Sequence, residues 1–162
     1  MTSRQHGFSL IELMIVIMLL AILAAMVVPR LVDATQDARE TALETDLQMM
    51  RRQIIVYKAQ HLGRGPHLDA EGKLDEANLP VRLTKRTNPD GRINPSGSCG
   101  PYMAEWPTNP FISSAETAVT VVFGTETTPP RNSASGWYYN TTTCVISPNS
   151  SKGGEKLDPN PD

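Results

Sequence analysis

The pattern of apolar and polar positions divides the chain into stretches of different character. A nearly continuous apolar run extends from Phe8 to Val28, and Ser9 and Glu12 are its only strongly polar residues. At a rise of about 1.5 Å per residue, this run would form a helix about 31 Å long, which matches a bilayer core of about 30 Å. The pattern therefore predicts a membrane-spanning helix over residues 8–30.

After this run the periodicity becomes that of an amphipathic helix over residues 31–63. Apolar side chains recur at spacings of three and four residues, at Ala38, Ala42, Leu43, Leu47, Met50, Ile54 and Tyr57. Gly63 and Gly65-Pro66 supply a stop signal, and Pro29 predicts a kink within the helical stretch. The short repeat and the many alanines argue against a parallel coiled-coil dimer, so we expect the protein's own globular part to cover this stripe.

Residues 64–148 predict a small globular domain of short elements, since all but one of the 13 prolines follow Gly63. Three β segments are expected, at 117–123, 136–140 and 144–147, and the last two read as a hairpin. A two-stranded hairpin is marginal alone, so the sheet needs the amphipathic helix. The predicted fold is α+β, with a long N-terminal helix packed on a small antiparallel β-sheet.

The C-terminal residues 149–162 are rich in serine, glycine, proline and aspartate. A segment with so few apolar residues cannot bury enough surface to offset its ordering entropy. We therefore predict a disordered tail from Asn149 onward.

Glu12 is the most informative residue of the apolar run, because a carboxylate inside a membrane segment is costly without a partner or a function. A plain membrane anchor gains nothing from it. A cleaved secretory signal fits poorly, because the run is long and has no small-x-small site before Pro29. If the chain is cut after Gly7, the new amino group on Phe8 lies four residues from Glu12. The amine of one subunit can then neutralise Glu12 of a neighbour and fix the register of two helices.

The segment Gly7-Phe8-Ser9-Leu10-Ile11-Glu12 resembles the processing site of type IV prepilins and type II secretion pseudopilins. This resemblance implies that residues 1–7 are a cytoplasmic leader and that prepilin peptidase cuts between Gly7 and Phe8. It further implies N-methylation of Phe8 and a role for Glu12 in assembly register. Pro29 stands where the family has its helix-kinking proline, and a pilin-like fold is implied.

The resemblance implies a structural subunit of a helical pilus-like filament, with a type II secretion pseudopilus that drives protein export as the leading expectation. A major or a tip-binding minor pilin of a type IV pilus is the alternative, and an unassembled single-pass membrane protein is a third. The expected partners are prepilin peptidase, copies of the chain and other pilins, an inner-membrane assembly platform, and membrane lipid before assembly. The expected location is the inner membrane, with the N-terminus cytoplasmic and the globular domain periplasmic.

Composition bears on two further properties, nucleic-acid binding and disulfide formation. A formal net charge of −2 provides no basic field, so no nucleic acid is expected as a partner. The two cysteines, Cys99 and Cys144, both lie in the globular part. A single cysteine pair in a chain that leaves the cytoplasm predicts one disulfide, with two reduced thiols as the alternative.

Two stretches, residues 69–75 and 88–94, place oxygen-bearing side chains around a glycine, as calcium loops do. Neither has the glutamate that an EF-hand needs at its twelfth position, so we favour glycine-centred turns, with calcium as the open possibility and no other cofactor expected. His61, His67 and Asp69 do not have the spacing of a compact metal site. The sequence contains no arrangement typical of a catalytic site, which predicts a protein that is not an enzyme.

Overall fold

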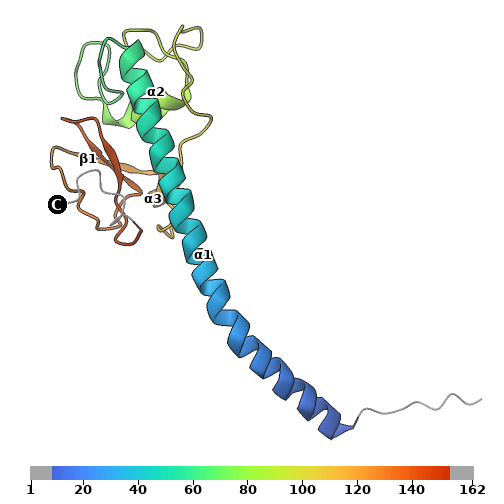
Figure 1. The fold of residues 1–162 in the computed structure, drawn as a ribbon. Helices are drawn as coiled ribbons and strands as arrows, with labels where there is room; N and C mark the ends of the chain where they lie inside the picture. The colour runs from blue at the N-terminus through green and yellow to red at the C-terminus, as the bar shows by residue number, and fades with distance from the viewer. Residues whose placement is uncertain (1–8, 154–162) are drawn as a thin grey trace, which may run out of the picture. The chain divides into compact units, whose positions relative to one another are not determined.

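A computed structural model describes residues 9–153 of the chain. The chain divides into two compact units, Met1–Ala38 and Arg39–Asp162. The long helix α1, Leu10–Gln60, contributes to both units and is the long coiled ribbon of Figure 1. The predicted helical stretches 8–30 and 31–63 therefore lie largely in one helix, which the structure describes from Leu10 to Gln60.

The end of α1 follows from local backbone chemistry. The N–H of Gly63 donates to the carbonyl oxygen of Lys58 at 2.8 Å, and Leu62 and Gly63 both have positive φ, 58° and 81°. A left-handed residue after the last turn satisfies carbonyl groups that the helix leaves unpaired. The predicted stop at Gly63 is confirmed.

The second unit covers one face of α1 with its sheet and loops. The five α1 residues of the hydrophobic core are at most 2% exposed: Leu43, Leu47, Met50, Ile54 and Tyr57. They pack with Leu79, Leu83, Met103, Trp137, Tyr139 and Ile146. The predicted stripe is thus buried from Leu43 onward, whereas Ala38 and Ala42 are exposed.

The sheet contains β1, Val121–Gly124, β2, Trp137–Asn140, and β3, Ile146–Pro148, in the order β1-β2-β3. Strands β2 and β3 form the predicted antiparallel hairpin, with Tyr138 opposite Ser147. Strands β1 and β2 are parallel, with Val121 opposite Trp137. The sheet is therefore mixed, and the prediction of an entirely antiparallel sheet was wrong.

Two features accompany the parallel pair, a shorter first strand and a long connection to the second. The predicted strand 117–123 is shorter, because Ala115–Val119 forms the helix α3, and the Ser114 hydroxyl accepts the N–H of Thr117 at 3.3 Å as its cap. The connection 125–136 is then long enough to return the chain to the start of β1, as a parallel crossover requires. The two other elements are the 3-10 turn η1, Glu76–Asn78, and the helix α2, Leu79–Thr84.

The C-terminal boundary of the ordered domain also differs from the prediction. Asn149 and Ser150 are 0% and 1% exposed, although we expected a disordered tail from Asn149. The Asn149 amide donates to the Ser135 hydroxyl at 2.8 Å, and the amide of Asn109 donates to the Ser150 hydroxyl at 3.2 Å. These partners lie far away in sequence and bond the buried amide nitrogen of Asn149 and the buried hydroxyl of Ser150. Residues 154–162 lie outside the described part of the chain.

Candidate functional site

The N-terminal part of α1 presents an apolar surface that no other described residue of its own unit covers. The large apolar side chains of this stretch are between 43% and 77% exposed: Leu10, Ile11, Leu13, Met14, Ile15, Val16, Ile17, Met18, Leu19, Leu20, Ile22, Leu23, Met26, Val27, Val28 and Leu31. By length and composition α1 can cross a membrane, with a mean hydropathy of 3.0 in its most apolar window. An apolar surface of this size requires lipid or protein around it.

Glu12 lies in the first turn of α1 and is exposed. A carboxylate at this position interacts favourably with the positive end of the helix dipole. Its nearest large apolar neighbours in sequence, Ile11 and Leu13, are 66% and 58% exposed, so a surrounding lipid or protein phase would also surround the carboxylate. That Glu12 takes a cationic partner from a neighbouring subunit stays a prediction.

Gly7 and Phe8 lie outside the described residues. The helix α1 continues through Pro29, so the predicted kink there stays a prediction. Among the residues singled out for processing and assembly, only Glu12 is described together with its surroundings.

The two histidines of the second unit are buried at separate polar contacts. The Nδ1 atom of His61 lies 2.8 Å from the carbonyl oxygen of Tyr57, and its Nε2 atom lies 2.9 Å from the Thr87 hydroxyl. The Nδ1 atom of His67 lies 3.1 Å from the Tyr139 hydroxyl. Both imidazoles thus have protein partners, and within residues 9–153 no group of three potential metal ligands occurs.

These histidines predict that the second unit loses stability in acid. Burial is the main cause that lowers the pKa of both residues, and nearby Arg82 lowers both further, whereas the Tyr57 carbonyl group and Asp90 oppose the shift at His61. Because the folded-state pKa values lie below the unfolded value of about 6.5, the stabilisation is complete above that pH and is lost as the pH falls below it.

We expect the free energy of unfolding to fall by at most about 1.4 kcal/mol per pH unit for each histidine in this window. Urea unfolding followed by tryptophan fluorescence at pH 7.5 and at lower pH measures this slope. His61→Gln and His67→Gln should each reduce the slope, and an unchanged slope in both variants would contradict the assignment of this pH dependence to the histidines.

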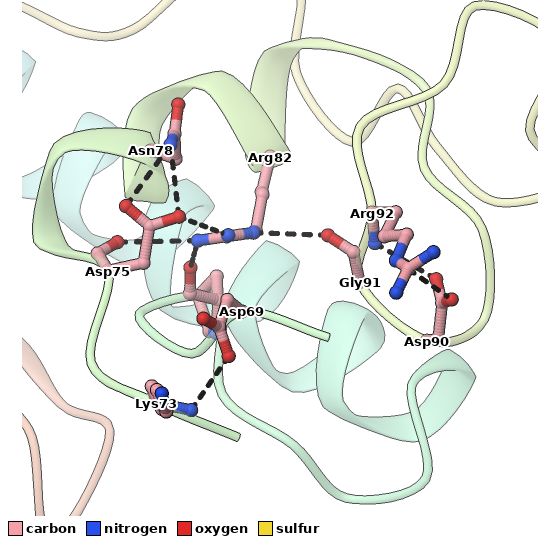
Figure 2. A network of polar contacts seen from close by, with 9 residues as sticks. Asp69, Lys73, Asp75, Asn78, Arg82, Asp90, Gly91 and Arg92 are labelled. Carbon is pink, nitrogen blue, oxygen red and sulfur yellow. Dashed lines mark hydrogen bonds and ion pairs between the residues drawn. The ribbon is translucent and has the colours of Figure 1, made fainter. Parts of the chain in front are cut away.

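The two stretches considered for calcium form glycine-centred turns, as favoured. In the first turn the Asp69 carboxylate accepts the N–H of Lys73 at 2.7 Å, and Gly72 has a φ of 82°. In the second, the Asp90 carboxylate accepts the N–H of Arg92 at 3.0 Å, and Gly91 has a φ of 90°. Figure 2 shows both turns beside the guanidinium group of Arg82, which lies between them.

Cys99 and Cys144 do not form the predicted disulfide in this structure, and both thiols are free. Cys99 lies in a backbone bridge to Thr87, with N–H to carbonyl oxygen distances of 3.0 Å in both directions. The Cys144 sulfur lies beside Gly65, close enough that a Cβ atom there would approach it to 2.9 Å. The two thiols therefore have separate surroundings, although both belong to the second unit.

A groove of about 360 Å³ runs along α1 in the second unit, between Asp46 and Met49 on the helix and the loop Met103–Thr108. The indole Nε1 of Trp106 is buried there without a hydrogen-bond partner, and burial raises the pKa of Asp46. The charges of this groove, Asp46 and Glu105, are acidic and would repel a polyanion.

Comparison with known proteins identifies the N-terminal segment and nothing beyond it. Residues 2–28 match the family model of the prokaryotic N-terminal methylation motif. Neither the curated proteins nor the solved structures contain a significant match to this chain. The matched segment includes Gly7, Phe8 and Glu12, and it ends just before Pro29. By this segment the chain carries the hallmark of the type IV pilin and pseudopilin family, the N-terminal methylation motif at the start of an apolar helix.

Proposed function

We propose that this protein is a structural subunit of a type II secretion pseudopilus, a helical filament that drives the export of folded proteins. The methylation motif supports a type IV pilin-like filament subunit. The observation that carries the proposal is the long exposed apolar surface of α1, which includes one carboxylate. A helix of this kind is suited first to lipid and then to the core of a helix bundle.

In this proposal, Glu12 sets the register of neighbouring subunits. Cleavage after Gly7 leaves an amino group on Phe8, four residues before the carboxylate. In a low-dielectric helix bundle an unpaired charge is strongly penalised, so the amine of one subunit pairs with Glu12 of another. A contact of this kind joins different surfaces on the two subunits and does not close, which generates a helical fibre.

The route to the filament follows from the same segment. The motif implies processing by prepilin peptidase and assembly with other pilins. The short head contains Arg4 and no acidic residue, so the positive-inside rule keeps it in the cytoplasm. The globular part then lies on the periplasmic side of the inner membrane, and an assembly platform in that membrane draws the processed chain into the filament.

Replacing Gly7 by alanine should block processing, because a side chain at this position obstructs the cut between Gly7 and Phe8. We expect intact mass spectrometry to find the leader 1–7 removed from the wild-type protein only when prepilin peptidase is present, and at least about tenfold less cleavage in the variant. Ser3→Ala is a control within the leader. If the wild-type protein has the same mass with and without prepilin peptidase, the proposal is wrong.

The export role is tested separately from filament formation. Deletion of the gene should retain folded export substrates in the periplasm without removing surface fibres. If deletion removes surface fibres and leaves export intact, the protein is a subunit of a type IV pilus, and the pseudopilus assignment is wrong. Either outcome is compatible with cleavage after Gly7 and with assembly into a filament.

A further inference from the structure

The guanidinium group of Arg82 is buried inside the second unit, with the side chain 4% exposed. Its Nε donates to the carbonyl oxygen of Gly91 at 3.1 Å. Its Nη1 donates to the carbonyl oxygens of Pro66 at 3.1 Å and Asp75 at 3.3 Å, and its Nη2 donates to the Asp75 carboxylate at 2.5 Å. One guanidinium group therefore donates to four oxygen atoms from three residues that are far apart in sequence, namely three backbone carbonyl oxygens and one carboxylate oxygen (Figure 2).

This set of partners resembles what a hard metal ion requires. Calcium is bound by carboxylate and backbone carbonyl oxygens supplied by a tight loop around a glycine. Here the carbonyl groups come from the start and end of one glycine-centred loop and from Gly91 of the other. Two of the carboxylates that suggested calcium accept backbone N–H groups of their own turns, Asp69 from Lys73 and Asp90 from Arg92, and a third, Asp75, is paired with Arg82. Calcium therefore does not fit between the two loops, because the guanidinium group occupies that space.

We infer that Arg82 is a tethered internal cation that locks loop 66–75 to loop 88–92 in the place where a metal ion would otherwise be needed. Burying a guanidinium group is costly unless it is paired and its N–H groups are bonded. Asp75 supplies the pairing charge, and the Asn78 amide donates to both of its carboxylate oxygens at 3.1 and 3.0 Å. The planar fork of arginine suits several fixed acceptors at once, which the single ammonium group of lysine does not.

Electrostatics supports the same arrangement. The hydrogen bond from Asn78 is the largest cause that lowers the pKa of Asp75, and the contact with Arg82 lowers it further. Asp75 therefore stays ionised at neutral pH and keeps its charge opposite the guanidinium group. The helix α2 fixes the other end of the contact, since Leu79 and Leu83 beside Arg82 are core residues.

The same two loops have a second ion pair that provides a matched control. Arg92 and Glu71 approach to 2.8 Å on the surface, with side chains 63% and 57% exposed. Exposed pairs of this kind contribute little, because water and salt screen them. The chain thus offers two arginines that link the same loops, one buried and one exposed.

Hydrogen exchange of the full chain in detergent micelles tests the inference, with Arg82→Met, Arg82→Lys and Arg92→Met compared with the wild type. We expect amides of residues 66–75 and 88–92 to exchange at least about tenfold faster in Arg82→Met and unchanged in Arg92→Met, because local opening follows the loss of buried contacts. Peptides from β2 serve as the internal reference for global unfolding.

The wild-type loops should exchange at the same rate in millimolar calcium and in chelator. If chelator accelerates their exchange, or if Arg82→Met leaves it unchanged, the inference is wrong. If Arg82→Met does not fold, Arg82→Lys tests the inference instead, because lysine keeps the positive charge but lacks the planar guanidinium group. Faster exchange confined to the two loops of Arg82→Lys supports the inference, and wild-type protection of both loops in that variant overturns it.

Discussion

Replacement of Glu12 by glutamine will leave cleavage after Gly7 intact and will abolish filament assembly. In the proposed filament, the amine on Phe8 of a neighbouring subunit loses its counter-charge within a bundle of apolar helices, where one uncompensated charge costs several kcal/mol. We expect the pelleted filament fraction to fall by more than about tenfold while the mass of the processed protein is unchanged. Sedimentation of sheared filaments and intact mass spectrometry measure the two quantities.

The matched control is Asp33→Asn, which removes the same charge from an exposed position of α1 beyond the apolar run. This variant should assemble as the wild type does. Normal assembly of the Glu12 variant would remove the register role but would leave the processing site untouched. Loss of cleavage in Glu12→Gln would show instead that the peptidase recognises Glu12.

Replacement of Leu47 by alanine will destabilise the second unit by about 2–5 kcal/mol, as truncation of a buried leucine leaves a cavity. Leu47 is 1% exposed and belongs to the core cluster that includes Trp137 and Tyr139. Urea unfolding of the full chain in detergent, followed by the fluorescence of buried Trp137, measures the change.

Ile55→Ala on the same helix is the control, because Ile55 is 68% exposed. Both substitutions place alanine in a helix interior, so helix propensity changes little between them. The effect of Ile55→Ala should stay within about 0.5 kcal/mol. Equal effects of the two variants would mean that the sheet and loops do not cover the Leu47 face of α1.

The long helix was predictable because its signals are local. An apolar run long enough to cross a bilayer, a following stripe with helical period and a glycine stop are each contained within a few turns of chain. The stripe also predicted which residues would be buried from Leu43 to Tyr57. It failed at Ala38 and Ala42, because periodicity identifies a face and does not show how far another segment extends along it.

Strand direction and polar burial were not predictable in the same way. Residues 117–119 belong to the stretch predicted as a strand and yet form the end of α3, which begins after the Ser114 cap and contacts the Gly136 backbone. The Gly136 N–H donates to the carbonyl oxygen of Thr117 at 2.8 Å, and a Cβ atom at Gly136 would collide with the carbonyl of Ala118. This close contact places β2 beside β1 in the parallel direction.

The candidate site shows the same division. The residues predicted for processing and assembly, Gly7, Phe8 and Glu12, form a linear signal that could be named from the sequence alone, and all three lie within the matched methylation motif at residues 2–28. Arg82 gave no such signal, because an arginine in a short helix is usually exposed and its partners Pro66, Asp75 and Gly91 are spread along the chain. Sequence by itself determined the helix, its buried face and its N-terminal methylation motif, since each rests on neighbouring residues. Only the tertiary structure decided the mixed sheet and the buried cation, since both depend on contacts between distant segments.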